Sequence, residues 1–67
     1  MNFRDEITEV EKIVLVKLCE QKTAKEIAYE LGISRRTIEG HKSDLIFKTG
    51  SKSMVGLVIH AIRNNIY

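Results

Sequence analysis

The side chains best suited to chemistry in this sequence lie between positions 23 and 43, and their chemistry is that of anion binding. Arg35, Arg36 and Lys42 are cations, and Thr37 and Ser43 carry hydroxyl groups. Such groups hold phosphate oxygens and donate hydrogen bonds to base edges. The chain shows no nucleophile paired with a base, no pair of carboxylates and no phosphate-cradling glycine loop. We therefore expect a binding site here and no enzymatic activity.

The composition indicates one small folded domain, which we take to span residues 1–67. The 67 residues are 43 % hydrophobic and 30 % charged, as in ordinary globular domains. The net charge is only +2, but residues 21–67 hold eight bases and four acids, whereas residues 1–20 hold three bases and five acids. A basic half favours a polyanionic partner such as double-stranded DNA.

Nothing in the sequence predicts export or membrane insertion. The segment MNFRDEIT lacks the apolar core of a signal peptide, and no stretch approaches the roughly 20 apolar residues of a membrane span. The single cysteine, Cys19, falls in an apolar helical pattern, where a buried hydrophobe is expected. We therefore expect a cytoplasmic protein with no membrane partner, no metal and no cofactor.

The elements that must position the cations are helices, so the expected fold class is a compact all-α domain. Thr8 and Thr23 are each followed three residues later by a glutamate, which is the capping-box pattern of a helix start. Gly32 and Gly50 stand where a left-handed residue would end a helix. The predicted helices span about 8–20, 24–31, 35–49 and 54–64.

Helical spacing predicts which side of each helix is buried. In the first helix the expected buried stripe is Val10, Ile13, Val14, Lys17 and Leu18. Phe3 and Ile7 are expected to cover an edge of the core. In the helix over 35–49 the residues expected to face the core are Ile38, His41, Leu45 and Thr49. The residues expected on its outward side are Arg36, Glu39, Gly40, Ser43 and Phe47.

Residues 23–43 have the spacing of a helix-turn-helix motif. Ala28 is small where two helices must cross closely, Gly32 suits the turn, and Ile27 and Ile38 can pin both helices to the first one. Gly40 costs about 0.8–1 kcal/mol relative to alanine, and on the outward side it would let the helix approach something closely. We expect the second helix of the motif to enter the DNA major groove. A helical hairpin without a ligand would show the same periodicity.

The helix over 54–64 is apolar on two sides. One side serves the core, and the second carries Val55, Ile59 and Ile62. This second stripe needs a cover, which could be the tail at Ile66 and Tyr67, a neighbouring domain or a second copy of the chain. We expect a homodimer that uses Val55, Ile59 and Ile62.

Taken together, the chain resembles the LuxR-type (GerE-type) DNA-binding domain over about residues 7–67. The matching segments are Ile7-Thr8 with Glu11, Lys25-Glu26-Ile27-Ala28, Ile33-Ser34-x-x-Thr37-Ile38-Glu39-x-His41 and Lys48-x-Gly50. The resemblance implies the effector domain of a bacterial transcription regulator that dimerises on DNA through its last helix. The run from Arg36 to His41 is most similar to response regulators, which implies a receiver or ligand-binding domain outside this chain.

The same resemblance implies roles for single residues. Thr23, Lys25 and Thr37 match phosphate contacts, and Glu39, Gly40 and Ser43 match base-facing positions. The sequence departs from the family at Glu39, where lysine is common, and at Met54, where arginine is frequent, so that Lys52 is expected to take over a phosphate. The full expected DNA-binding set is Thr23, Lys25, Arg35, Arg36, Thr37, Glu39, Gly40, Lys42, Ser43 and Lys52.

Some alternatives stay open at this level. Glu39 could read a base or instead pair along its helix with Arg35 or Ser43. A sigma-factor region-4 domain would share the helix-turn-helix and bind promoter DNA together with RNA polymerase, which is therefore a further candidate partner. An interaction module that no longer binds DNA is the third alternative, because bases are missing at positions 39 and 54.

Overall fold

The computed structural model describes residues 6–67, which fold into four helices and no strand. In chain order they are α1 (Glu9–Cys19), α2 (Ala24–Leu31), α3 (Arg35–Thr49) and α4 (Met54–Arg63). The expected all-α, four-helix fold is confirmed, and the expected helix bounds agree with these to within one residue. Phe3 lies outside the described residues, and Ile7 packs against the core as expected.

Side-chain caps explain why the helices begin where they do. The Thr8 hydroxyl accepts from the Glu11 amide at 3.1 Å, and the Glu11 carboxylate accepts from the Thr8 amide at 2.8 Å. Thr23 and Glu26 form the same capping box at the start of α2. Each box satisfies two amide groups that have no partner inside the helix. These starts are therefore fixed by local sequence.

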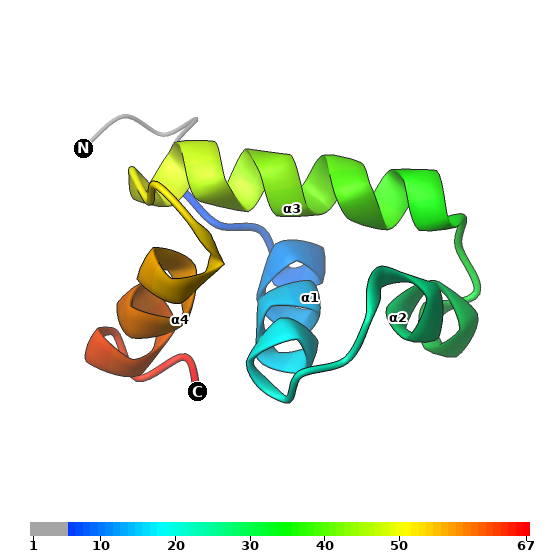
Figure 1. The fold of residues 1–67 in the computed structure, drawn as a ribbon, viewed down its shortest axis with the longest axis horizontal. Coiled ribbons are helices and arrows are strands. Elements are labelled where there is room, and N and C mark those ends of the chain that lie inside the picture. The colour runs from blue at the N-terminus through cyan, green and yellow to red at the C-terminus, as the bar shows by residue number, and fades with distance from the viewer. Residues whose placement is uncertain (1–5) are drawn as a thin grey trace.

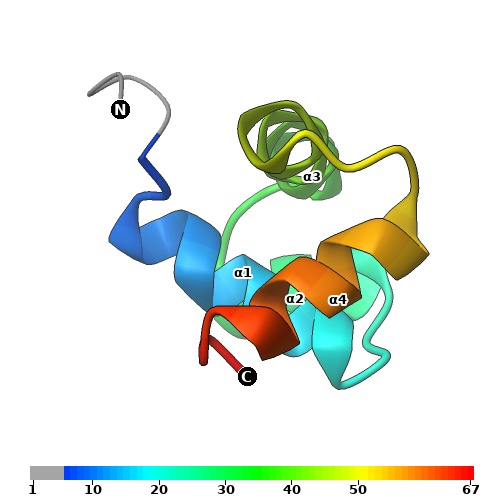
Figure 2. The same ribbon diagram turned by 90° about the vertical axis from the view of Figure 1, so that its left-hand side faces the viewer.

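The helices form two layers, with α3 lying across the other three. Figure 1 shows α2 near the first turns of α3, α1 below its middle and α4 below its last turns. Viewed along α3, as in Figure 2, the other helices lie together on one side of it. One side of α3 is therefore packed along its whole length, and the opposite side faces away from the protein.

The core lies between these two layers. Its fully buried members from α3 are Ile38 and Leu45, and Leu57 and Ala61 come from α4. The complete set of buried hydrophobic residues is Val14, Leu15, Leu18, Ile27, Ala28, Ile38, Leu45, Leu57 and Ala61. Because α3 supplies residues that α1, α2 and α4 all pack on, the core depends on its placement.

The expected buried stripe of α1 is wrong at two positions. Val10 and Ile13 are 46 % and 45 % exposed, whereas Leu15 is fully buried and Glu11 is 3 % exposed. The helix is turned so that Glu11 reaches Lys48 of α3. The buried side of α1 is therefore formed by Glu11, Val14, Leu15 and Leu18, and the Glu11–Lys48 pair lies at its edge.

Among residues 6–67, no single helix is long and apolar enough to cross a membrane. Only α3 and α4 counted together, with a bend of 64° between them, reach the required length and composition.

Candidate nucleic-acid interface

The α2–turn–α3 unit is built by a left-handed glycine and a serine cap. Gly32 has a φ of +68°, and the Ile33 amide donates to the Ala28 carbonyl at 3.1 Å. Ser34 then accepts from the Thr37 amide at 3.0 Å and starts α3. Ala28 is 7 % exposed, so its small side chain lies within the packed region of α2. The two helices therefore have the geometry of a helix-turn-helix motif.

The outward face of α3 is polar along its first three turns. Arg36, Gly40 and Ser43 are exposed, and they lie opposite Ile38 and Leu45, which are fully buried. Figure 1 shows the other helices on one side of α3, and the opposite side of α3 faces away from them. The expected division of α3 into a core side and an outward side is therefore confirmed, and the outward side is open to a partner.

Gly40 has no role in packing within the described part of the chain. A Cβ atom built on Gly40 would meet nothing within 4 Å. The backbone conformation there is ordinary helix, so neither space nor a positive φ requires glycine. The stability that glycine costs in a helix is not recovered inside this domain.

Glu39 pairs with Lys42, which differs from the expected partners Arg35 and Ser43. The Lys42 ammonium lies 3.2 Å from the Glu39 carboxylate, and their side chains are 32 % and 48 % exposed. Side chains that are three or four residues apart in the sequence are neighbours on the surface of a helix. The pair partly neutralises Lys42, whereas Arg36 on the same face forms no ion pair with any residue of 6–67.

The other expected DNA-binding residues surround this face. Lys25, Arg35 and Lys52 are exposed and form no ion pair among residues 6–67. The Thr37 hydroxyl lies 2.8 Å from that of Ser34. The exposed Thr23 hydroxyl accepts from the Glu26 amide at 3.1 Å. Cations and hydroxyl donors are thus present at both ends of the motif.

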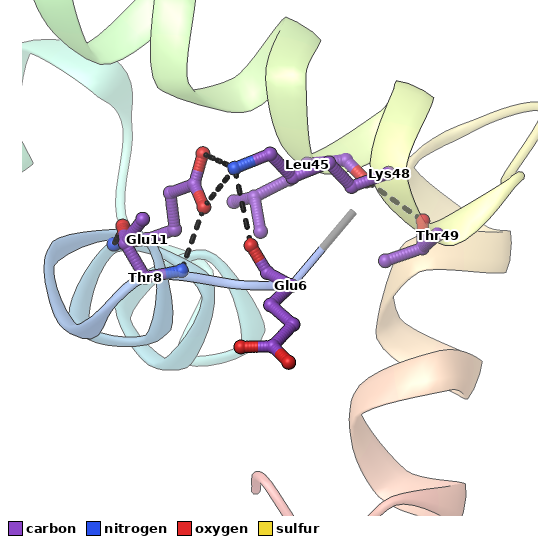
Figure 3. Close-up of polar contacts among 6 residues, drawn as sticks. All are labelled: Glu6, Thr8, Glu11, Leu45, Lys48 and Thr49. Carbon is purple, nitrogen blue, oxygen red and sulfur yellow. Dashed lines mark hydrogen bonds and ion pairs between the residues drawn. The ribbon is translucent and has the colours of Figure 1, made fainter. Parts of the chain in front are cut away.

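A buried ion pair fixes α3 against α1. Figure 3 shows Lys48 reaching from α3 to the start of α1, where its ammonium lies 2.8 and 3.0 Å from the two Glu11 oxygens and 3.2 Å from the Glu6 carbonyl oxygen. All three ammonium donors therefore have a partner. Burial raises the pKa of Glu11, but the hydrogen bonds from Lys48 and Thr8 and the Lys48 charge outweigh it, so that pKa lies below its ordinary value. This pair was not predicted from the sequence, although Glu11 and Lys48 both belong to the segments that resemble the family.

A second ion pair network fixes α2 against α1. Glu30 of α2 accepts from Lys17 of α1 and from Lys22 of the connection, both at 2.6 Å. These hydrogen bonds lower the pKa of Glu30, and the bond to Glu30 raises the pKa of Lys22. Lys17 and Lys22 are therefore ion-paired with Glu30, and we do not count them among the cations that could contact DNA.

One group of side chains has the composition of a metal site but is already occupied. Glu11, His41 and Asp44 place one ligand atom each within 4.8 Å of one another. The Glu11 carboxylate, however, holds the Lys48 ammonium with both oxygens. A second positive charge beside that ammonium is electrostatically unfavourable. His41 is half-buried at the α1–α3 contact, on the core side of α3 where it was expected.

The second apolar stripe of α4 is exposed. Val55, Ile59 and Ile62 are 69 %, 44 % and 55 % exposed. The tail does not cover them, because Ile66 turns back through a bond from its amide to the Ala61 carbonyl and packs against the core. A shallow apolar hollow continues the stripe toward Leu18 of α1.

Two short helices joined by a left-handed glycine, with a polar outward face on the second, define a helix-turn-helix domain. The family described as bacterial regulatory proteins, luxR family (GerE), matches residues 5–61. The chain is also 39 % identical over 57 residues to the spore germination protein GerE of Bacillus subtilis (strain 168), which covers 85 % of this chain and 77 % of that protein. No solved structure matches the chain at a significant level.

The chain therefore belongs to the LuxR (GerE) family and is a DNA-binding domain of a transcriptional regulator. The family is not enzymatic, which agrees with the expectation from the sequence. Membership decides against the sigma-factor alternative.

Proposed function

We propose that α3 is the recognition helix and lies in the major groove of double-stranded DNA. The observation that carries this proposal is the outward face of α3, where Gly40 occupies an open position that the fold itself does not need. A missing side chain at the centre of that face allows the helix backbone to approach base edges closely. Arg36 and Ser43, on either side of Gly40, are then the side chains nearest to the bases.

Phosphate contacts frame this reading surface in the proposed complex. Lys25 and Thr23 at the start of α2, with Arg35 and Thr37 at the start of α3, would hold one DNA strand. Lys52, in the connection before α4, would hold the other end. Hydroxyl and amide donors at helix starts suit phosphate oxygens, because the helix dipole adds a partial positive charge there. These contacts set position, whereas base contacts set sequence.

Glu39 has two consequences for the proposed interface. Its carboxylate can accept a hydrogen bond from the N4 amino group of cytosine. Its charge also opposes phosphate and holds Lys42 at 3.2 Å. We therefore assign guanine readout to Arg36, and we assign Lys42 to phosphate contact only after it leaves Glu39.

We further propose that two copies bind one site through Val55, Ile59 and Ile62. One domain neutralises few phosphates, and each lowers the slope of log K against log salt by about 0.9. A single copy would thus bind weakly at physiological salt, and pairing of the exposed α4 stripes would join two copies. The chain would act in the cytoplasm under a receiver or ligand-binding domain outside it, with RNA polymerase as a further partner.

A binding selection followed by charge substitutions tests the recognition helix. Random-sequence DNA is selected with the 67-residue chain, and the affinity of variants for the selected site is measured by gel shift. Arg36→Ala is expected to weaken binding at least tenfold, and Arg36→Ala with Lys42→Ala further. Glu39→Gln is expected to strengthen binding to non-specific DNA, since it releases Lys42 and removes a negative charge.

Lys12→Ala is the matched control. Lys12 forms an exposed 3.8 Å pair with Glu9, three residues away, on α1 rather than on α3. Equal affinity of the Arg36→Ala and Lys12→Ala variants would show that α3 is not in the groove. Failure to select any DNA would favour the pure interaction module.

A further inference from the structure

Phe47 is a large aromatic side chain that the proposed interface does not yet use. It is 81 % exposed, whereas its neighbour Leu45 is fully buried. At about 100° per residue, Arg36, Gly40, Ser43 and Phe47 fall within one narrow stripe of α3. Phe47 therefore lies on the same outward side as the proposed base-reading residues, directly opposite the core.

The position of Phe47 along α3 determines which base pairs it could contact in the proposed complex. It lies about 6 Å along the helix axis beyond Ser43, at a rise of about 1.5 Å per residue. That distance corresponds to roughly two base pairs at a spacing of about 3.4 Å. Gly40 and Ser43 are small, so in the proposed complex the helix can lie deep in the groove there, and Phe47 would be the first large group to meet the bases beyond them.

The chemistry of the groove narrows the choice of contact. In the major groove the one apolar group on the base edges is the C5 methyl of thymine, and phenylalanine is among the side chains that contact it. Of the two residues adjacent to Phe47 in the sequence, Ile46 is apolar and packs against the core, and Lys48 is turned inward and bound to Glu11.

Building on the proposed function, we propose that Phe47 is a specificity-determining residue that selects thymine about two base pairs beyond the position read at Ser43. The contact would cover an aromatic surface that is otherwise left in water, and it would extend the reading surface of α3 into its fourth turn. Glu39 and Arg36 would still read the first positions.

The test removes only the methyl group. Within the selected site, each thymine is replaced in turn by deoxyuridine, and affinities are measured for the wild-type chain and for Phe47→Ala. The wild-type chain is expected to lose roughly fourfold at one thymine of each half-site, the loss for one buried methyl group. The Phe47→Ala variant is expected to bind the thymine and deoxyuridine sites equally. Circular dichroism checks that this exposed substitution leaves the fold intact.

Tyr29→Ala is the matched control, because Tyr29 is 89 % exposed but lies on α2. That variant is expected to keep the full preference for thymine. The proposal is overturned if the Phe47→Ala variant still distinguishes thymine from deoxyuridine, or if the wild-type chain never does. The recognition-helix proposal fails by a different result, namely an Arg36→Ala variant that binds DNA with unchanged affinity. That result would overturn the Phe47 proposal as well.

Discussion

The ion pair between Glu11 and Lys48 shows how single residues set the geometry of this domain. The side chains are 4 % and 18 % exposed, so the Glu11 carboxylate is buried and the Lys48 ammonium is largely shielded from water. The desolvation cost is met only because every Lys48 donor and both Glu11 oxygens have partners. Loss of one member would leave the other charged and buried.

We expect Lys48→Met to destabilise the domain by about 3 kcal/mol near neutral pH, the low end for breaking a buried pair. In the wild-type chain the pKa of Glu11 is lowered, so its contribution to stability is complete above the unfolded pKa of about 4.3 and is lost as the pH falls through the lower folded value. In the variant the hydrogen bond and the charge of Lys48 no longer lower that pKa, while burial still raises it. The difference between the two proteins should therefore shrink toward acidic pH, as measured by urea unfolding between pH 3 and pH 8.

The exposed pair of Lys12 and Glu9 provides the control, with side chains 50 % and 89 % exposed. Lys12→Met should change stability by less than about 1 kcal/mol, because exposed pairs contribute little. An equal effect of the two substitutions would mean that the Lys48 pair does not hold α3 in place.

The orientation of single side chains was the part that the sequence predicted least well. The pattern of Val10 and Ile13 looked like a buried stripe, yet both are exposed. The charged residue Glu11 takes a buried position on that helix and contacts Lys48, and no local pattern predicts such a pair. The partner of Glu39 was likewise one of several that helical spacing allows, and only the side-chain conformations select Lys42.

At the scale of elements, α3 has two roles: its inner side packs in the core, and its outer side is open to a partner. Its inner side supplies Ile38 and Leu45 to the core, and its outer side carries Gly40 in open space. A glycine that lowers helix stability without a packing reason is best explained by what the helix must approach.

Gly40→Ala is therefore expected to separate folding from function. The added methyl group meets nothing within the domain, so stability should rise by about 0.8–1 kcal/mol and the melting temperature by roughly 4–8 °C. Affinity for the selected DNA site should fall about tenfold, because the methyl group would hold the helix away from the bases. Thermal unfolding and gel shift measure the two effects on one protein.

Gly56→Ala is the control within α4. A Cβ atom at Gly56 would lie 3.5 Å from the Ser51 Cβ, an ordinary contact, so this variant should also be more stable. It should bind DNA as the wild type does. If Gly40→Ala raised stability and left affinity unchanged as well, Gly40 would have no role in DNA approach.

The helices themselves were predictable because their boundaries are local. Thr8, Thr23, Ser34 and Ser53 each accept from an amide three residues later, and Gly32 and Gly50 have the positive φ that their positions required. The outward side of α3 followed from spacing in the same way. Which outward residues touch DNA cannot be read from spacing, because it depends on a partner that the chain does not contain.

At the scale of the whole molecule, the exposed stripe of α4 has a testable consequence. We expect Ile59→Glu to change the stoichiometry of the DNA complex from two chains per site to one, because it puts a charge into a paired apolar surface. Ile59 is 44 % exposed, so the single domain should still fold. Sedimentation of the protein–DNA complex measures the change.

Ile13→Glu is the corresponding control, since Ile13 is 45 % exposed on α1, outside the α4 stripe. It should leave two chains on each site. If Ile59→Glu also left two chains, the pairing surface would have to lie elsewhere on the molecule.

Because α3 both packs in the core and is proposed to bind DNA, binding of DNA should affect global unfolding of the domain. The helix that we place on DNA is the one on which α1, α2 and α4 all pack, as Figures 1 and 2 show. A ligand that binds only the folded chain lowers the population of the globally unfolded state by a factor of one plus the ratio of its concentration to its dissociation constant. This factor is about a hundred at one hundred times that constant. Some backbone amides in the buried parts of α1 and α4 exchange with solvent only when the whole domain unfolds. DNA would therefore protect these amides from exchange, although they do not contact the DNA. Hydrogen exchange deep in the core would thus report on occupancy of the groove.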